Sequence, residues 1–288
     1  MLVFSLVFYA WGEPKYVLLL LAMSFFDWLM ARVIESRRDS PAAGLAVAGA
    51  CFFSLGLLAV FKYGGFIAEN IAALTGSDLS FSVALPIGIS FYTFQLLTYV
   101  IDVYRGDVKA EKSFAGVLLY ASLFHQCIAG PIVRYKDIAA QIKRRSVTEA
   151  DIGLGIQRFA AGLGKKALLA NACGAMADEL LLSDAAIASA DQTANIGLIT
   201  GRPAFALWLG VAFYTLQIYL DFSAYSDMAI GMGRMTGFRY KENFDYPYCS
   251  SSVTEFWRRW HISLGTFFRA FPSDSSPERR ACERKDSG

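Results

Sequence analysis

The sequence predicts an all-α protein that crosses a membrane several times. Of its 288 residues, 55% are hydrophobic and only 18% are charged, whereas roughly a quarter of the residues of soluble domains are charged. Aromatic residues make up 15% of the chain, which suits lipid-facing surfaces and interfacial belts. Because a single segment in lipid satisfies its backbone hydrogen bonds only as a helix, we expect a polytopic bundle of transmembrane helices.

Five apolar stretches have about the length that a membrane crossing requires, which is roughly 20 residues. Only the first of them contains a formally charged residue, Asp27, and they comprise residues 16–31, 42–61, 81–101, 114–133 and 204–220. Weaker candidates, which we expect to be amphipathic, re-entrant or short, are residues 152–172, 185–200 and 222–233. Residues 1–11 lack a basic leader region, so we interpret them as the end of a span and not as a signal peptide.

Basic residues gather in three segments, 32–38, 134–145 and 234–241, and the positive-inside rule places such segments on the cytoplasmic side. Three strong candidate spans separate the first two, and three crossings would put them on opposite faces. Either one stretch does not cross, or one basic segment is functional. The suspected interruption is L-P-I-G-I-S at residues 85–90, since Pro and Gly break helices.

Several function classes are disfavoured by composition and motif spacing. The net charge of +2 is too small for a nucleic-acid-binding surface. The five cysteines form no C-x-x-C pair, so neither a metal site nor a disulfide framework is expected. The Gly-containing strings at residues 162–166 and 231–237 miss the spacing of nucleotide-binding loops, and there is no G-x-S-x-G sequence of a hydrolase.

Only two histidines, His125 and His261, are available for proton transfer at neutral pH. Ser252 and Glu255 have the spacing of a capping box, which predicts a helix start. The helical period would then place on one face Trp257, Trp260, His261, Leu264 and Phe268. Arg258 would lie one turn before His261, so both side chains can address one anionic ligand, such as the phosphates of an acyl donor. An alternative interpretation of this helix has equal weight. In it the helix lies at the membrane surface, where its aromatic residues are anchors and its arginines contact lipid phosphates.

Carboxylates in apolar segments are expensive unless they are partnered, so Asp27, Asp221 and Asp227 are functional candidates. The structural alternative has equal weight: Asp221 pairs with an arginine, or caps a turn through Ser223. His125, in the middle of an apolar stretch, is interpreted as a packing residue that bonds across helices.

The motifs together resemble the bacterial branch of the membrane-bound O-acyltransferase family, in particular the alginate O-acetylases. Near the C-terminus they are D-F-S-A-Y-S-D-M-A-I-G at 221–231, E-N-F-D-Y-P-Y at 242–248 and E-F-W-R-R-W-H-I-S-L at 255–264. Upstream matches are F-Y-A-W-G-E-P at 8–14, F-K-Y at 61–63, L-P-I-G-I-S-F-Y-T-F-Q at 85–95, Y-V-I-D-V-Y-R at 99–105 and I-A-G-P-I-V-R-Y at 128–135.

The resemblance implies a multi-pass inner-membrane protein, with one membrane domain over residues 1–270 and a central tunnel. It implies transfer of an acetyl group from a cytoplasmic donor, such as acetyl-CoA, toward a secreted polysaccharide, with a periplasmic acetyltransferase and the exopolysaccharide machinery as partners and no bound cofactor or metal. His261 matches the family's R-R-W-H histidine and would be the general base. The expected substrate-binding or supporting residues are Asp221, Ser223, Tyr225, Asp227, Asn243, Glu255, Trp257, Arg258, Arg259 and Trp260.

The chain departs from the family pattern at three places. The family has a further apolar span before F-Y-A-W-G, and it has a Pro where this chain has His125. After R-R-W-H-I-S-L the family continues with more spans and a W-H-G histidine, whereas nine of the 20 residues from 269 to 288 are charged. We therefore expect residues 271–288 to be a disordered or frameshifted tail, and the chain to be a truncated acyltransferase that transfers little acetyl by itself.

Two other function classes remain open from the sequence. Coupled transporters bind ions through intramembrane ionisable residues beside interrupted helices. Such residues here are Asp27, Asp221 and His125, although the sequence shows no inverted repeat. A non-catalytic membrane scaffold is the third class, and in it His261→Ala would change only abundance. Alginate, cellulose and other exopolysaccharides, or D-alanylation of teichoic acid, are the acceptor systems that the resemblance allows.

Overall fold

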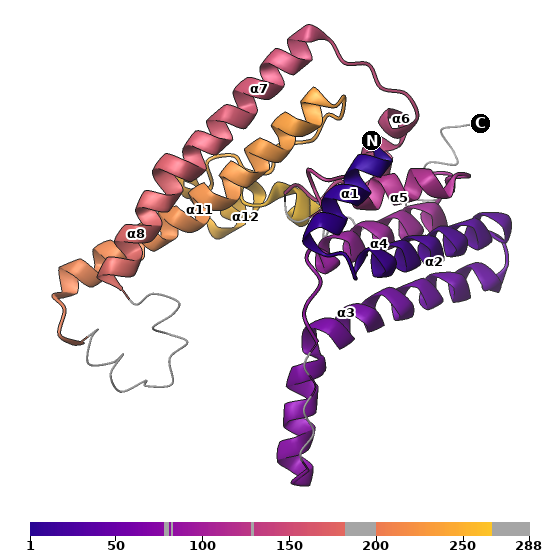
Figure 1. Ribbon diagram of the computed structural model, residues 1–288, viewed down its shortest axis with the longest axis horizontal. Helices are drawn as coiled ribbons and strands as arrows, with labels where there is room; N and C mark the ends of the chain where they lie inside the picture. Colours follow the sequence, from indigo (N-terminus) through magenta and orange to yellow (C-terminus); the bar gives the residue numbers. More distant parts are fainter. Residues whose placement is uncertain (78–80, 82, 128–129, 182–199, 267–288) are drawn as a thin grey trace. The chain divides into compact units, whose positions relative to one another are not determined.

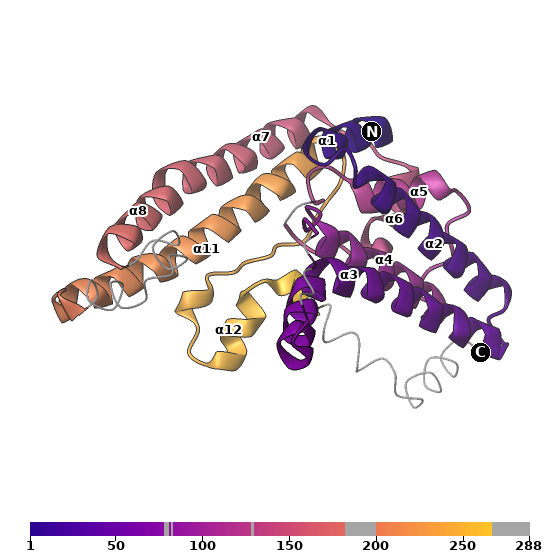
Figure 2. The same cartoon turned by 60° about the horizontal axis from the view of Figure 1, so that its bottom comes forward.

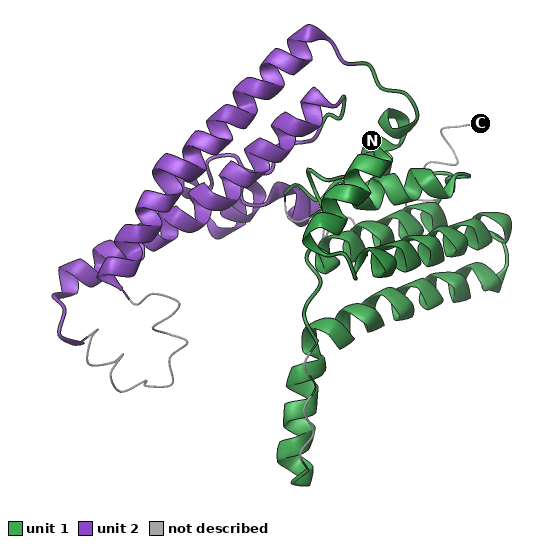
Figure 3. Cartoon of the chain, viewed as in Figure 1, with its two compact units in different colours: residues 1–146, 237–239, 267–288 green, residues 147–236, 240–266 purple. Residues whose placement is uncertain are grey.

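The computed structural model describes residues 1–77, 81, 83–127, 130–181 and 200–266, and all regular structure within these ranges is helical (Figure 1). The described chain forms two compact units. Unit 1 comprises residues 1–146 and 237–239, and unit 2 comprises 147–236 and 240–266 (Figure 3). The all-α prediction is confirmed, while one membrane domain over residues 1–270 stays a prediction. The predicted tail, 271–288, and residues 185–199 of a weak candidate span lie outside the described residues.

Three described helices are long and apolar enough to cross a membrane: α2 (Val17–Ser36), α3 (Pro41–Thr75) and α11 (Ala204–Met235). They confirm the candidates at 16–31, 42–61 and 204–220 as helices and extend each of them. The weak candidate at 222–233 is wrong as a separate element, because α11 runs through it without a break. Asp221 does not end the helix, since Lys166 neutralises its carboxylate at 2.7 Å.

The other two strong candidates are wrong as continuous helices. At 81–101 the helix α4 (Ile89–Arg105) begins only after Gly88, whose φ of 76° is left-handed, so the suspected interruption is real. At 114–133 the helix α5 (Phe114–Ser122) has nine residues, far fewer than the roughly 20 of a crossing. The chain turns back after α5, and the hydroxyl of Tyr120 donates to the carbonyl of Val133 at 2.8 Å.

The first two basic segments lie at the same end of unit 1. The guanidinium of Arg38 donates to the carbonyl of Val103 at 3.0 Å, which joins the end of α2 to the end of α4. Arg134, just before α6 (Tyr135–Lys143), and Lys136 both pair with Asp107 beyond α4. Helix α3 begins close to the end of α2 in the chain, and α4 ends beside Arg38. This arrangement favours the alternative in which one stretch does not cross, which stays a prediction.

The core of unit 1 contains aromatic rings and buried polar groups, of which several make a hydrogen bond or an ion pair. The apolar helix α1 (Leu2–Gly12) packs beside α5. The buried carboxylate of Asp102 pairs with Arg134, which is also buried, and Asp27 accepts a hydrogen bond from the hydroxyl of Ser54 at 3.0 Å. His125 is fully buried between the rings of Phe124 and Phe238. This environment supports the interpretation of His125 as a packing residue.

Unit 2 is built around a long helical run that lies along α11 (Figure 2). The run consists of α7 (Glu149–Gly164), a π-helical segment (Lys165–Ala170) and α8 (Asn171–Leu180), and it contains the weak candidate at 152–172. The backbones approach closely, because a Cβ added at Gly231 would lie 2.7 Å from the carbonyl oxygen of Gly155. Within the π-helical segment both Lys165 and Lys166 pair with carboxylates on α11.

Candidate functional site

The predicted helix around the R-R-W-H motif is interrupted at the histidine. Helix α12 (Val253–Arg259) begins where it was expected, with the hydroxyl of Ser252 accepting from the Glu255 N–H at 3.2 Å. His261 then has a left-handed φ of 43°, and helical turns resume at residue 262. The prediction of one helical face carrying Trp257, Trp260, His261, Leu264 and Phe268 is therefore wrong, and Phe268 lies outside the described residues.

The interruption has a tertiary cause in the preceding segment. The N–H of Ile262 donates to the carbonyl of Asn243 at 2.9 Å, and the N–H of Asp245 donates to the carbonyl of Arg259 at 3.0 Å. These bonds replace helical ones on both sides of the histidine. A left-handed backbone at a residue with a Cβ costs about 1–3 kcal/mol and persists where its surroundings enforce it, often at functional sites. The strain at His261 thus fits a site residue.

The side chain of Asn243 determines which ring nitrogen of His261 carries the proton. Asn243 is fully buried, and its Nδ2 donates to the hydroxyl of Ser226 at 3.0 Å. Its Oδ1 accepts from the backbone N–H of Ser263 at 3.3 Å and from that residue's hydroxyl at 2.8 Å. The same oxygen lies 3.0 Å from Nδ1 of His261, so Nδ1 must be the donor. The lone pair of the ring is then on Nε2.

Burial keeps this imidazole neutral. The ring of His261 meets Phe222 edge-on at 4.8 Å between centroids, and desolvation lowers its pKa from the ordinary 6.5 to about 4. At neutral pH the ring is therefore an uncharged base, with Nδ1 anchored and Nε2 unprotonated.

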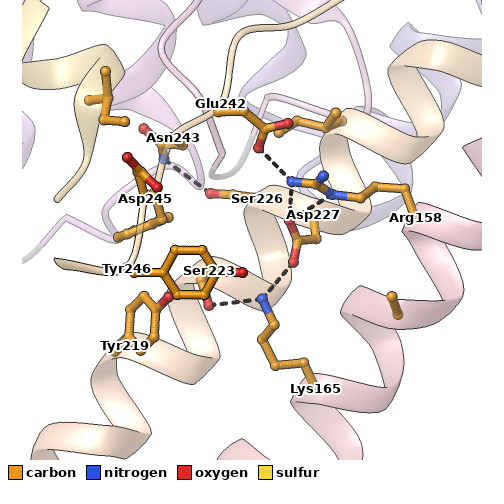
Figure 4. Close-up of a pocket in the computed structure, with 14 residues that line it drawn as sticks. Arg158, Lys165, Tyr219, Ser223, Ser226, Asp227, Glu242, Asn243, Asp245 and Tyr246 are labelled. Carbon is orange, nitrogen blue, oxygen red and sulfur yellow. Dashed lines mark hydrogen bonds and ion pairs between the residues drawn. The ribbon is translucent and has the colours of Figure 1, made fainter. Parts of the chain in front are cut away.

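A cavity of about 670 Å³ opens beside Asn243 within unit 2 (Figure 4). Helix α7 contributes Arg158 and α11 contributes Asp227, while Glu242 and Asn243 come from the segment after α11. His261 does not line the cavity, but its hydrogen-bond partner Asn243 and its chain neighbour Ile262 do. The complete lining is Arg158, Ala161, Lys165, Tyr219, Ser223, Ser226, Asp227, Ile230, Glu242, Asn243, Phe244, Asp245, Tyr246 and Ile262.

Alternating charges cross one wall of this cavity (Figure 4). The carboxylate of Asp227 accepts from Arg158 through one oxygen at 2.7 Å and from Lys165 through the other at 2.6 Å. Arg158 also pairs with Glu242, and Lys165 donates to the hydroxyl of Ser223 at 3.3 Å. Each cation of the wall thus has a carboxylate partner.

The remaining predicted residues fall into two groups. Asp221 lies outside the cavity and pairs with Lys166 rather than with an arginine, while Ser223 reaches the cavity. Arg259 pairs with Glu255 at 2.8 Å, within α12. Trp257 and Arg258 are exposed, Tyr225 is half-buried, and Trp260 packs on Phe244 and Phe256. Because the helix breaks, the expected pairing of Arg258 and His261 one turn apart is wrong.

Sequence reasoning missed several members of the site. Arg158 and Lys165 lie in the weak candidate span 152–172, and neither they nor Glu242, Ser226 and Ser263 were singled out. The available signal was the cost of two cations in an apolar helix, which requires carboxylates on a neighbouring helix. Periodicity cannot say which carboxylates these are.

Comparisons with known proteins place the chain among membrane acyltransferases. Residues 107–270 match the model of the membrane-bound O-acyltransferase family. A probable alginate O-acetylase of Pseudomonas aeruginosa is 38% identical over 94% of this chain and 50% of its own length. A peptidoglycan O-acetyltransferase of Helicobacter pylori is 28% identical over 93% of the chain and 53% of its length. A teichoic acid D-alanyltransferase of Bacillus subtilis is 24% identical over 64% and 44%.

The match covers nearly the whole of this chain but only part of these proteins. The chain spans about half the length of these two curated O-acetyltransferase relatives, and the family match extends through both the cavity and His261. The extent of this match and the identity along nearly the whole chain confirm the resemblance seen in the motifs. The chain belongs to the membrane-bound O-acyltransferase family.

Proposed function

We propose that this chain contributes the base-bearing part of an O-acyltransferase that spans the bacterial inner membrane several times. It takes an acetyl group from a cytoplasmic donor, such as acetyl-CoA, and passes it toward a hydroxyl of a secreted polysaccharide such as alginate. The observation that carries the proposal is the neutral His261, whose Nδ1 is fixed by Asn243 beside a polar cavity. The names of the relatives supply the reaction class.

In the proposed reaction Nε2 of His261 takes the proton of the acceptor hydroxyl as its oxygen attacks the thioester carbonyl. The new carbon–oxygen bond forms while the carbon–sulfur bond breaks, and the proton held on Nε2 passes to the departing thiolate. Asn243 keeps the imidazole oriented, and its Oδ1 stabilises the transient imidazolium through the Nδ1 proton. A positioned base of this kind contributes about 10²–10⁴-fold to a rate.

The charge distribution of unit 1 supports the proposed orientation. Both basic segments of unit 1, 32–38 and 134–145, lie at one end of it, and the positive-inside rule assigns such an end to the cytoplasm. The acyl donor would then approach from that side. A periplasmic acetyltransferase and the exopolysaccharide machinery would receive the acetyl group on the other side.

Acetyl transfer in whole cells tests the proposal in two forms. Because the chain spans half of the Pseudomonas relative, a chimera joins residues 1–266 to the remainder of that relative, and polymer acetylation is measured in cells lacking their own enzyme. We expect acetylation by the chimera, its loss with His261→Ala at equal abundance, and little transfer by the chain alone. Acetylation that survives His261→Ala would refute the role of the base and favour a scaffold.

A further inference from the structure

The helical turn that follows His261 is capped by a residue from a different segment. Residues 262–266 are helical, and the first N–H groups of a helix have no acceptor within it. The N–H of Ile262 donates to the backbone carbonyl of Asn243 at 2.9 Å, and the N–H of Ser263 donates to its side-chain Oδ1 at 3.3 Å. Asn243 therefore supplies both acceptors at this helix start.

The amide of Asn243 can lie in two orientations, because half a turn exchanges its oxygen and its NH₂ group. In the observed one, Oδ1 faces the N–H of Ser263 and Nδ1 of His261, while Nδ2 faces the hydroxyl of Ser226 (Figure 4). In the reversed one, Nδ2 would face the N–H of Ser263, donor against donor. It would also donate to Nδ1 of His261, so the proton of the neutral ring would be on Nε2. Each amide orientation thus corresponds to one position of the ring proton.

One partner of the amide distinguishes the two orientations. The hydroxyls of Ser226 and Ser263 contact it as well, but a hydroxyl both donates and accepts, so it can pair with either end. A backbone N–H only donates. Among the described residues, Ser263 alone offers such an N–H to the side chain of Asn243. The cost of a buried donor without an acceptor corresponds to a preference of about tenfold or more for the observed orientation.

The strained backbone at His261 makes this N–H available. If α12 continued through the left-handed His261, the N–H of Ser263 would donate to the carbonyl of Arg259 four positions earlier. That carbonyl accepts instead from the N–H of Asp245 at 3.0 Å. The break in the helix therefore turns a helical donor toward the amide of Asn243.

We infer that Ser263 is a positioning residue: its backbone N–H fixes the amide of Asn243 and thereby keeps the ring proton of His261 on Nδ1. Nε2 is then left unprotonated. The inference rests on the proposed function, in which Nε2 is the base, but the position of the proton is measured without acetyl transfer.

Two variants at one position separate the N–H from the side chain. Ser263→Ala removes the hydroxyl and keeps the N–H, whereas Ser263→lactic acid has the same methyl side chain with an ester oxygen in place of the N–H. The full chain is made by cell-free synthesis into lipid nanodiscs with ¹⁵N-labelled histidine and without a histidine tag. The chain has only two histidines, so His125→Leu assigns the ring signals in the nitrogen NMR spectrum.

The signals of His261 should differ between these two variants. The unmodified chain and Ser263→Ala should show the proton on Nδ1 only. The lactic acid variant should add a second set of signals with the proton on Nε2, at least about one tenth as intense. Leu264→leucic acid makes the same ester change one residue further on, at an N–H that is not among the described partners of Asn243, and should leave the proton on Nδ1.

Asn243→Asp tests whether the proton moves through reversal of the amide. Both oxygens of a carboxylate accept, so an aspartate has no orientation to lose. Combined with Asn243→Asp, and at a pH where the ring is neutral, the lactic acid change should no longer place the proton on Nε2. A purely structural role of Ser263 would not give this rescue.

The inference is overturned if the unmodified chain carries the proton on Nε2, if the lactic acid variant keeps it on Nδ1, or if Leu264→leucic acid also moves it. It is overturned too if Asn243→Asp fails to restore the Nδ1 form. The dependence of acetyl transfer on His261 is decided separately in the chimera. The expected signals together with transfer that survives His261→Ala would remove the proposed base and keep the control of the ring proton by Ser263.

Discussion

The two histidines are in different environments. Charged groups of the two units differ in the same respect: a pair in unit 1 is buried in a core, and several in unit 2 lie beside a cavity. His125 in unit 1 is fully buried between aromatic rings, whereas His261 in unit 2 is half-buried, strained and anchored at one nitrogen. The buried pair of Asp102 and Arg134 in unit 1 is sealed in the core. The charges of unit 2 instead line an open cavity.

This difference shows that the same residue types stabilise the fold in one unit and are placed for chemistry in the other. A polar group that is buried against its partner in a core can hold elements together but cannot meet a substrate. A group anchored on one side, with a cavity nearby, can do both. We therefore expect substitutions in unit 1 to change stability and substitutions in unit 2 to change chemistry.

The largest contrast is expected when leucine replaces each histidine in the chimera. His261→Leu should lower acetyl transfer by about 10²–10⁴-fold, because the base is lost, with little change in thermal stability. His125→Leu should leave transfer per folded molecule within about threefold, because an apolar ring environment accepts leucine. Transfer is normalised to folded protein, and comparable losses at both positions would break the comparison.

Carboxylate neutralisation should affect the free energy of unfolding more in unit 1. Asp102→Asn leaves the buried Arg134 with only the more distant Asp107, at 3.7 Å, as a counter-charge, which should cost up to about 3–5 kcal/mol. Asp227→Asn should cost about 1–2 kcal/mol, because Arg158 keeps Glu242 and Lys165 keeps Ser223. Reversible unfolding in mixed micelles measures both. A larger loss at Asp227 than at Asp102 would contradict the assignment of structural ion pairs to unit 1.

Two glycine substitutions compare the packing of the long helices. Gly231→Ala places a methyl group 2.7 Å from the carbonyl oxygen of Gly155, so it should destabilise the pairing of α7 with α11 by about 1–3 kcal/mol. Gly49→Ala on α3 meets nothing within 4 Å and should stabilise the helix by about 0.5–1 kcal/mol. Opposite signs in the same unfolding assay are the expected result, and equal signs would place the close helix contact elsewhere.

The smallest expected effect is on the pH dependence of the acetyl-transfer rate. Because burial lowers the pKa of His261 to about 4, the base stays unprotonated down to about pH 5, and transfer should not fall with the ordinary histidine pKa. Asn243→Asp places a negative charge beside Nδ1, which raises the pKa and moves the acidic limb of the rate profile to higher pH. Asn243→Ala should lower the rate without this upward movement. An acidic limb unmoved by Asn243→Asp would mean that His261 is not the titrating group.

The sequence alone predicted the helical class, three of the long apolar helices and the family, because apolar length and motif order are local properties of the chain. It also singled out His261, Asn243, Ser223 and Asp227. The hypothesis that one stretch between the basic segments does not cross stays a prediction; the structure shows that the helix at 81–101 begins only after Gly88 and that the helix at 114–133 ends at Ser122. The hydroxyl of Tyr120 donates to the carbonyl of Val133, a contact that apolar composition does not encode.

Only the tertiary structure decided how the site is assembled. Helical periodicity placed His261 on the same helix as Arg258, but backbone bonds from Asn243 and Asp245 to residues far along the chain outweigh the local preference and break the helix. The partners of Asp227 are Arg158 and Lys165, more than 60 positions away. Local pattern determines which segments become helices, whereas the matching of charges and small residues between α7 and α11 determines which side chains meet around the cavity.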